Sequence, residues 1–314
     1  MLGSEVRIDL VQGLRDVGRQ TWRWSTVGIG RILVTGANGQ LGRDAVELLA
    51  DRYEVVAATR AELDVTSWPR VRAMAEQTEP AVILHAAAYT HVDAAESNPA
   101  SAYRINALGT KNVARAAREF GARLVYISTD YVFDGESERP YKEFDPVRPL
   151  NVYGHSKLIG ESYAAALCPD GLVLRTSWLY GAGGENFVST IIRLAASEPE
   201  LKIVDDQEGT PTWTKELVRQ IDLLLERDAC GLYHVTGSGA CTWYEFAREI
   251  LRLHGVETPV VPVPTSAFER PAKRPRYSVL ENYNLALENS NVMKDWRAAL
   301  AEHLDESSLE RRPA

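Results

Sequence analysis

Two side chains that could move a proton, Tyr153 and Lys157, stand four residues apart in the segment Tyr-Gly-His-Ser-Lys. In a helix this spacing places both on one face, about one turn apart. A phenol is a poor acid or base near neutrality, because its free pKa is about 10. A neighbouring ammonium favours the phenolate and so lowers that pKa. The pair therefore predicts a proton-transfer site, although the same spacing also arises by chance on solvated helices.

A glycine-rich segment upstream has the pattern of a phosphate-binding loop. Residues 32–34 predict a strand, Gly36, Gly39 and Gly42 follow, and the next residues predict a helix that continues to about Asp51. Glycines allow a close backbone approach, and the start of a helix presents free N–H groups to a pyrophosphate. The sequence therefore predicts a dinucleotide site. The alternative is a glycine-rich turn that serves packing alone.

The residues after the second predicted strand bear on the choice of cofactor. In dinucleotide-binding folds an acidic residue there binds the ribose 2′-hydroxyl of NAD, whereas an arginine accommodates the 2′-phosphate of NADP. Here the strand is followed by Arg60, with Glu62 nearby. Arg60 favours NADPH, and Glu62 keeps NADH as the alternative.

From Arg31 onward, short apolar runs alternate with stretches of helical periodicity. This alternation predicts an α/β protein: a Rossmann-like doubly wound parallel sheet with a smaller C-terminal substrate-binding lobe. The expected strands are residues 32–34, 55–58, 82–84, 124–127 and 172–174, and the expected helices are 41–51, 67–77, 101–120 and 154–167.

The same pattern predicts the domain boundaries. We expect an N-terminal extension of unknown role at 1–30, an NAD(P)-binding domain at 31–178, a mainly substrate-binding lobe at 179–304 and a tail at 305–314. The chain is expected to return to the sheet near 202–236. Within the extension, residues 6–17 are spaced like a short amphipathic helix, and in the lobe Thr242 and Glu245 have capping-box spacing before a helix that ends near Gly255.

Composition excludes several classes of protein. The net charge of −8 disfavours non-specific binding to nucleic acid or to an anionic membrane surface. Cys168, Cys230 and Cys241 have no spacing typical of a disulfide framework or a zinc site, and we expect them to be buried, reduced thiols. No apolar run is long enough to span a membrane, and no secretory leader is recognisable, which predicts a cytoplasmic protein.

Several segments share their order and spacing with a known superfamily. The glycine loop, Leu63–Thr66, His85–Thr90, Ser128–Phe133 and the Tyr153/Lys157 pair resemble the extended short-chain dehydrogenase/reductases. More narrowly, the chain resembles the dTDP-4-dehydrorhamnose reductase family from about Arg31 to Leu300, at residues 92–96, 128–134, 149–154, 175–180 and 205–212.

This resemblance implies roles for the candidate catalytic residues. Tyr153 would donate a proton to the C4 oxygen of a sugar while NAD(P)H delivers a hydride to C4. Lys157 would hold the nicotinamide ribose and lower the pKa of Tyr153. Thr129 would hydrogen-bond the reacting carbonyl, and Asn106 would support a proton relay.

The resemblance also implies the binding residues. Those expected to bind the cofactor, besides Tyr153 and Lys157, are Gly36, Gly39, Gln40, Leu41, Gly42, Arg60, Asp64, Val65, Ala88, Tyr89 and Thr90. Those expected to bind the substrate are Asp93, Thr129, Asp130, Trp178 and, from a basic proline-rich segment, Arg274. A homodimer and a Mg²⁺ ion at a dimer contact stay open, and the sequence identifies no metal ligands.

The implied reaction is the NAD(P)H-dependent reduction of dTDP-4-dehydro-L-rhamnose to dTDP-L-rhamnose, in dTDP-rhamnose biosynthesis. One alternative is another nucleotide-sugar 4-ketoreductase, from a secondary-metabolite sugar pathway. A second is a non-catalytic NADP-binding regulatory subunit, which the joint presence of Thr129, Tyr153 and Lys157 disfavours. A dehydratase is disfavoured because Thr129 is followed by Asp130 and Tyr131 instead of an acid/base pair.

Overall fold

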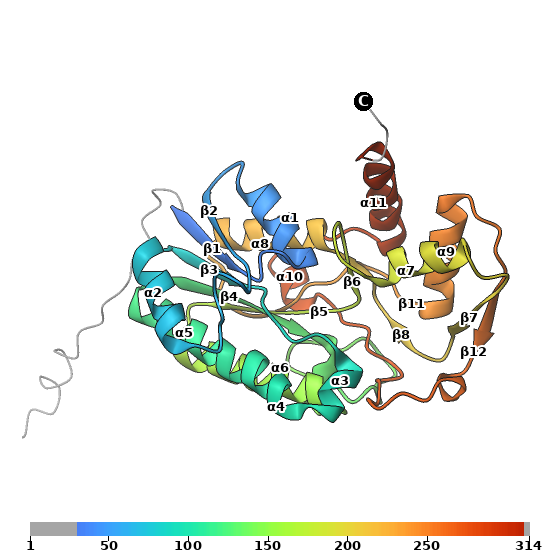
Figure 1. The fold of residues 1–314 in the computed structure, drawn as a ribbon, viewed down its shortest axis with the longest axis horizontal. Coiled ribbons are helices and arrows are strands. Elements are labelled where there is room, and N and C mark those ends of the chain that lie inside the picture. The colour runs from blue at the N-terminus through green and yellow to red at the C-terminus, as the bar shows by residue number, and fades with distance from the viewer. Residues whose placement is uncertain (1–29, 311–314) are drawn as a thin grey trace, which may run out of the picture.

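The computed structural model describes residues 30–310, so the helix predicted near residues 6–17 lies outside the described residues. A six-stranded sheet forms the centre (Figure 1), with the order β2-β1-β3-β4-β5-β10 and every strand parallel to its neighbours. Its strands are β1 Arg31–Thr35, β2 Glu54–Ala58, β3 Val82–His85, β4 Arg123–Thr129, β5 Leu172–Thr176 and β10 Gly231–His234. The predicted doubly wound α/β fold is confirmed.

Helices cover both faces of the sheet, as its apolar strands require. Ile32 and Val34 point to one face and pack under α1 (Gln40–Leu49), α8 (Thr214–Glu226) and α10 (Tyr283–Leu287). Leu33, between them, points to the other face, which is covered by α2 (Trp68–Thr78), α5 (Thr110–Glu119) and α6 (Val152–Leu167). Figure 1 shows these two groups of helices on opposite sides of the sheet.

The helix predicted at 101–120 is not one regular helix. After α3 (Val92–Ser97), the chain forms α4 (Pro99–Ala102), a π-helical segment η1 (Tyr103–Gly109) and then α5. A π-helical turn holds an extra residue and is common at functional sites. Here it contains Asn106, whose side chain bonds the backbone of Tyr89 on a neighbouring segment. That long-range contact is the physical reason for the departure from the predicted helix.

The second lobe is built from short paired strands and three longer helices. The pairs are β6 (Leu179–Tyr180) with β9 (Thr212–Trp213), β7 (Leu201–Val204) with β12 (Val260–Val263), and β8 (Glu208–Gly209) with β11 (Cys241–Thr242). The helices are α7 (Phe187–Ala195), α9 (Trp243–His254) and α11 (Trp296–Glu310), with a 3-10 turn at η3 (Thr265–Ala267). Another 3-10 turn, η2 (Asp130–Val132), follows β4 of the central sheet.

The core of this lobe is aromatic. Trp213, Phe246 and Trp296 are fully buried in it. The predicted capping box of α9 is confirmed, since Thr242 and Glu245 each accept a hydrogen bond from the other's backbone N–H. Gly255 ends the helix in the left-handed conformation, with φ of 72°.

Within the range 202–236 predicted for the return to the sheet, β10 joins β5, whereas β7 pairs with β12 in the lobe. At the end of the described chain, α11 continues to Glu310, past residue 305, where the tail was predicted to begin.

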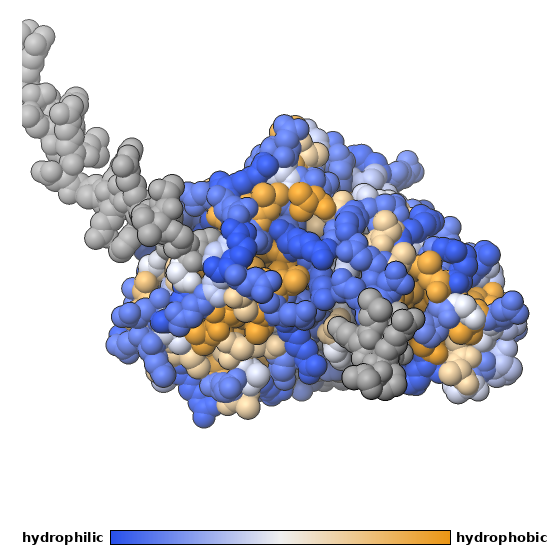
Figure 2. Space-filling model, turned by 90° about the horizontal axis from the view of Figure 1, so that it is seen from above, coloured by the Kyte–Doolittle hydropathy of each residue, from blue (hydrophilic) through white to orange (hydrophobic). Residues whose placement is uncertain are grey.

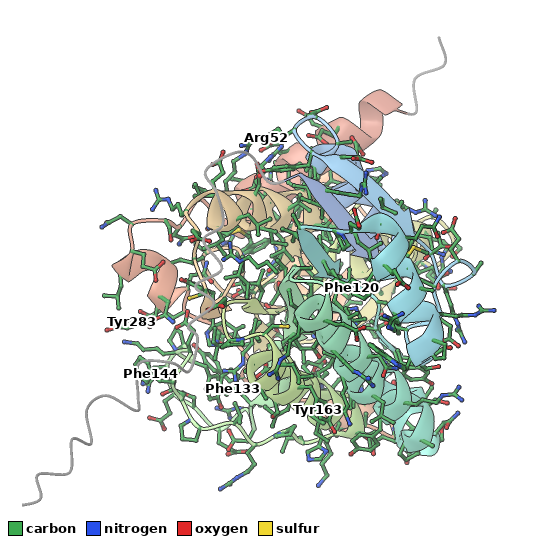
Figure 3. All side chains as sticks on the ribbon, turned by 90° about the vertical axis from the view of Figure 1, so that its left-hand side faces the viewer. Arg52, Phe120, Phe133, Phe144, Tyr163 and Tyr283 are labelled. Atoms are coloured by element: carbon green, nitrogen blue, oxygen red, sulfur yellow. The ribbon has the colours of Figure 1, made fainter. Side chains whose placement is uncertain are left out.

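The surface in Figure 2 is mainly hydrophilic, with separate smaller apolar areas. Among the exposed apolar side chains, Phe144 packs edge-to-face on Tyr283 with ring centroids 5.5 Å apart (Figure 3). All three cysteines are free, but the prediction that they are buried is confirmed only for Cys241, since Cys168 is partly exposed and Cys230 is exposed. None of the described helices is long and apolar enough to cross a membrane.

The tight entry into α1 yields a stability prediction. A Cβ atom added at Gly42 would lie 2.2 Å from the carbonyl oxygen of Gly36, which is backbone and cannot rotate away. Gly42→Ala should therefore reduce the free energy of unfolding by about 1–3 kcal/mol, as overpacking does, measured by urea denaturation. The control is Gly30→Ala, since a Cβ at Gly30 would meet nothing within 4 Å. Equal midpoints for the two variants would contradict the prediction.

Candidate active site

A cavity of about 670 Å³ opens at the carboxyl-terminal edge of the sheet. Its walls come from the glycine loop after β1, the residues after β2 and β3, the ends of β4 and β5, and the first turns of α6. In the strand order, β1 lies between β2 and β3, so the chain places β2 on one side of β1 and β3 on the other. Open α/β sheets bind ligands at such a switch point.

Helix α6 brings Tyr153 and Lys157 to this cavity. Asn151 caps the helix by accepting a hydrogen bond from Gly154 N–H at 2.8 Å. Tyr153 lies in the first turn, and the buried Lys157 donates from Nζ to the carbonyl oxygen of Ile127 on β4 at 2.5 Å. Both side chains line the cavity. The predicted helical spacing of the pair is confirmed.

The direction in which the Tyr153 pKa moves is the opposite of the predicted one. Burial raises the pKa of Tyr153 to about 12, and its hydrogen bond with Thr129 only partly offsets this. Burial also lowers the pKa of Lys157 to about 7, against the favourable charge of Glu161. Desolvation is the largest cause of both shifts, with Lys157 buried and Tyr153 half-buried. Near neutrality Tyr153 is a protonated phenol, which suits a proton donor.

Thr129 and Asp130 lie at the end of β4, across from Tyr153. Both line the cavity and both are buried. Thr129 donates to Asp130 at 3.0 Å, and Asp130 Oδ2 is buried without a hydrogen-bond partner. Burial raises the pKa of Asp130 to about 6, partly offset by hydrogen bonds from Ser278 and Thr129. The site therefore places two groups beside the phenol of Tyr153: the hydroxyl of Thr129 and the carboxyl of Asp130, one oxygen of which has no hydrogen-bond partner.

Asn106 lies behind the cavity wall instead of in it. It accepts from Tyr89 N–H at 2.7 Å and donates to Tyr89 O at 3.1 Å and to Ser156 Oγ at 2.9 Å. Ser156 in turn donates to the carbonyl oxygen of Tyr153 at 2.8 Å. Asn106 thus joins the first turn of α6 to the segment after β3.

The residues predicted to bind a cofactor all line the cavity. They are Gly36, Gly39, Gln40, Leu41, Gly42, Arg60, Asp64, Val65, Ala88, Tyr89, Thr90, Tyr153 and Lys157. Arg60 is exposed at the rim, just past the end of β2. Glu62 does not line the cavity and accepts a hydrogen bond from Thr59 N–H at 2.8 Å.

Two of the predicted substrate residues are paired with each other and lie outside the cavity lining. Arg274 donates to Asp93 through Nη1 at 3.0 Å and Nη2 at 2.8 Å, and Arg270 adds a third contact at 3.3 Å. The hydrogen bonds from Arg274 lower the pKa of Asp93. The proline-rich segment is thereby fastened to α3. Trp178, by contrast, does line the cavity, as predicted.

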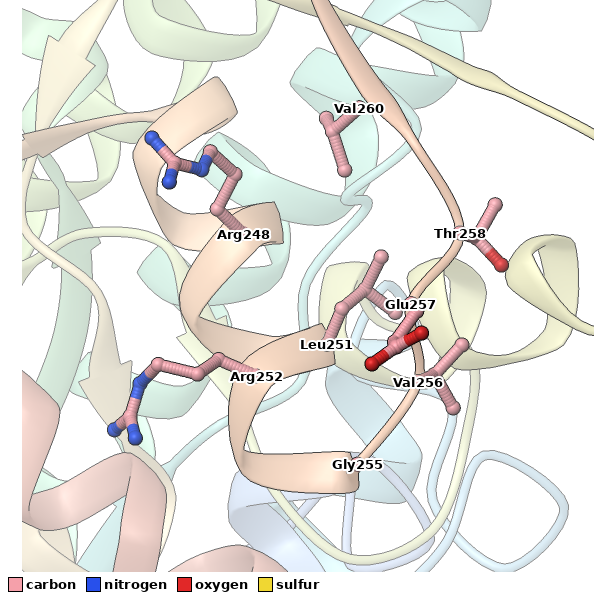
Figure 4. A pocket seen from close by; sticks show the side chains of 8 residues that line it. All are labelled: Arg248, Leu251, Arg252, Gly255, Val256, Glu257, Thr258 and Val260. Atoms are coloured by element: carbon pink, nitrogen blue, oxygen red, sulfur yellow. The ribbon is translucent and has the colours of Figure 1, made fainter.

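A second hollow, of about 420 Å³, lies between the end of α9 and β12 (Figure 4). Arg248, Arg252 and Val260 are among its lining residues, and none of the predicted site residues borders it. Within residues 30–310, no group of three His, Cys, Asp or Glu side chains could hold a metal ion. The described part of the chain therefore offers no such ligand set for the Mg²⁺ ion whose presence the sequence left open.

Comparison with known proteins agrees with this geometry. Residues 30–309 match the family described as RmlD substrate binding domain. The chain belongs to this family. It is 45% identical over 280 residues to a dTDP-4-dehydrorhamnose reductase of Streptomyces griseus, an alignment that covers 87% of this chain and 92% of the relative.

Two further proteins are informative. A dTDP-4-keto-6-deoxy-D-glucose reductase of Streptomyces niveus is 42% identical, over 87% of this chain and 96% of the relative. The crystal structure of a dTDP-4-dehydrorhamnose reductase from Bacillus anthracis, in complex with NADP, superposes with a TM-score of 0.86 at 41% identity, over 88% of this chain and 99% of that one.

This RmlD-family cavity has lining residues to which the sequence pattern assigned no role. Arg104 in η1 is near Asn106 and Ser177 lies in the segment 175–180, but neither was among the predicted site residues. The loop with Gly183 and Gly184 did carry a signal, a glycine cluster after a strand. Both glycines have positive φ, and the loop contacts the phosphate loop through the hydrogen bond from Gln40 to Glu185 O at 3.3 Å.

The buried ammonium of Lys157 predicts a pH-dependent stability. Because folding lowers the pKa of Lys157 from 10.5 to about 7, the unfolded chain binds more protons between these values and the folded state becomes more stable as pH rises. Lys157→Met removes the unfavourable free energy of burying the ammonium. It should raise the urea midpoint most at about pH 6 and progressively less towards pH 10 or so.

The control for this experiment is Lys111→Met, because Lys111 is an exposed lysine on α5. Its substitution should shift the midpoint little and equally at both pH values. A Lys157→Met protein that is less stable than the wild type at the lower pH would contradict the account of the buried ammonium.

Proposed function

We propose that the protein reduces the 4-keto group of a dTDP-deoxysugar with NADPH, and that its reaction is the conversion of dTDP-4-dehydro-L-rhamnose to dTDP-L-rhamnose. The observation that carries this proposal is the meeting of Thr129, Tyr153 and Lys157 with a glycine phosphate loop in one cavity. The 45% identity to a reductase with this substrate in its name supports it.

The residues of the cavity fit a dinucleotide. Gly39 caps α1 without a side-chain hydrogen bond, so the first N–H groups of the helix are free to bind a pyrophosphate. Gly36 has φ of 69°, and no larger residue fits there, since a Cβ would lie 2.8 Å from the backbone of Ala87. Lys157 would hold the nicotinamide ribose. The bound cofactor supplies a hydride equivalent to the sugar carbonyl carbon.

The chain's own residues supply the proton and the orientation. Tyr153, kept protonated by burial, would donate its phenolic proton to the C4 oxygen as that oxygen gains charge. Thr129, whose O–H donates to Asp130 in the structure, would turn this O–H to the same oxygen and hold the carbonyl in line. Asn106 would act as a positioning residue, because it anchors both Tyr89 and Ser156.

The direct test supplies dTDP-4-dehydrorhamnose and NADPH, follows the loss of absorbance of the reduced cofactor, and identifies the sugar product. Tyr153→Phe should bind NADPH normally but lower turnover by at least ~100-fold, the usual scale for a positioned acid. Cofactor binding without any oxidation by the wild type would refute the reductase. Near-normal turnover of Tyr153→Phe would remove Tyr153 from the role of proton donor.

A second prediction concerns the cofactor. Arg60 borders the cavity while Glu62 does not, which supports a preference for the 2′-phosphate of NADPH. Arg60→Ala should weaken NADPH binding by about tenfold or more, since it removes a charge-assisted hydrogen bond, and should change NADH binding little. Arg70→Ala, at an exposed position on α2, is the matched control. Equal losses for both cofactors in Arg60→Ala would show that the 2′-phosphate is bound elsewhere.

The relative from Streptomyces niveus gives a specific second candidate, reduction of dTDP-4-keto-6-deoxy-D-glucose. The two candidate substrates share the nucleotide and the 4-keto group and differ in the configuration of the sugar ring. Comparing kcat/KM for the two separates them. A preference for the second sugar would keep the proposed chemistry and change the substrate.

A further inference from the structure

We propose that Trp243, the first residue of α9, is a positioning residue for the sugar: it holds the indole of Trp178 against the reacting end of the cavity. This inference deepens the proposed function and rests on it. Trp243 does not itself line the cavity, whereas Trp178 does. Its influence on the sugar is therefore exerted through Trp178.

The backbone of Trp178 needs such support. Its φ is +45°, in the left-handed region that bulky side chains rarely adopt. Strained residues of this kind persist when surrounding contacts fix them, and they cluster at ligand sites. Trp178 directly follows Ser177, which is buried and donates a hydrogen bond to Thr210 O at 2.7 Å. The strain thus falls where the chain leaves β5 for the second lobe.

Two elements of the second lobe hold the ring. Trp243 stacks on it, with ring centroids 3.4 Å apart and an angle of 7° between the planes. Gly209 in β8 lies against the indole nitrogen side of the ring, where an added Cβ would be only 2.5 Å from Cε2 and 2.7 Å from Nε1. With these parts covered, the remaining surface of Trp178 is what borders the cavity.

Neighbouring contacts hold Trp243 in place. Phe187 packs on Trp243 with ring centroids 4.5 Å apart. The capping box of Thr242 and Glu245 fixes the start of α9, and β11 joins this start to β8 through the pair of Cys241 with Gly209. Both contacts to Trp178 therefore come from one continuous structural unit of the lobe.

Trp178 lies on the substrate side of the cavity. Thr129 pairs in register with Thr176 across β4 and β5, and Trp178 is two residues beyond Thr176. The ring is therefore next to the strand end that carries the hydroxyl proposed for the carbonyl. A 6-deoxyhexose offers C–H groups and a methyl group that suit an aromatic surface. The position of the Trp178 ring would select among sugars by their shape at this end.

The test measures steady-state kinetics of Trp243→Leu, Trp243→Phe and Gly209→Ala with the 4-keto sugar, together with NADPH affinity. Trp243→Leu should raise KM for the sugar by about three- to tenfold, the range expected for loss of an aromatic pair, and should leave NADPH affinity within about twofold. Trp243→Phe should restore most of the affinity. Gly209→Ala should raise the same KM by displacing the ring from its other side.

A double-mutant cycle tests whether Trp243 acts through Trp178. If it does, Trp243→Leu should cost little once Trp178→Leu is present, because coupled residues are not additive. Fully additive losses, or an unchanged sugar KM in Trp243→Leu, would overturn the proposal. Trp296→Leu is the control for lost packing alone: it removes a buried aromatic ring of the same cluster that packs on Phe246, and it should lower stability without changing the sugar KM.

The stack can also be tested without a substrate. The near-ultraviolet circular dichroism of two stacked indoles depends on their mutual orientation, so Trp243→Leu and Trp178→Leu should each change the spectrum. Variants that both leave the wild-type spectrum unchanged would overturn the proposal. Failure of the proposed function is a different outcome, since the variants would then change the spectrum while no 4-keto sugar is reduced.

Discussion

The hydrogen bond from Lys157 to the carbonyl oxygen of Ile127 ties helix α6 to the end of β4. A second bond, from Tyr126 OH to Lys157 O at 3.0 Å, fastens the same turn of the helix to the same strand. Together they fix the distance between the helix that carries Tyr153 and the strand that carries Thr129. The proposed function would have the phenol of Tyr153 and the hydroxyl of Thr129 share a substrate oxygen, which requires this fixed distance.

Burial shifts the pKa values of the residues at this site, and it also lowers the stability of the fold. The carboxyl ends of the parallel strands meet at one edge, where Asp130 and Lys157 are buried. Desolvation keeps Tyr153 protonated and raises the pKa of Asp130 to about 6. It also lowers the pKa of Lys157, so the fold loses stability at the residue that would hold the cofactor ribose. Such trade-offs are common at active sites.

Local patterns in the sequence were sufficient for the sheet, the phosphate loop and the Tyr153/Lys157 pair, because each depends on residues within one or two turns. The π-helical segment at Asn106 could not be predicted, since its cause is a bond to Tyr89, a neighbour in space. The same is true of the ion pair between Asp93 and Arg274, which lie 181 residues apart. Contacts of this kind leave no periodic signal.

The pKa of Tyr153 was mispredicted for a related reason. The sequence places a lysine one turn away, and that proximity suggests a lower pKa. It does not reveal that Lys157 is buried and Tyr153 half-buried, and desolvation proves to be the largest cause of both shifts. The substrate side was likewise predicted in part: the motif around Trp178 identified the residue, whereas its partner Trp243 comes from a helix that looked purely structural.

The proposed function requires that NADPH bound in this cavity transfers a hydride to C4 of a nucleotide sugar while the chain supplies the proton. It is tested most directly by NMR of the product formed from dTDP-4-dehydrorhamnose and NADPH carrying deuterium at the transferable position of the nicotinamide. The account predicts a dTDP-rhamnose with deuterium at C4 and at no other sugar carbon. Deuterium elsewhere in the sugar, or an unlabelled product, would contradict it.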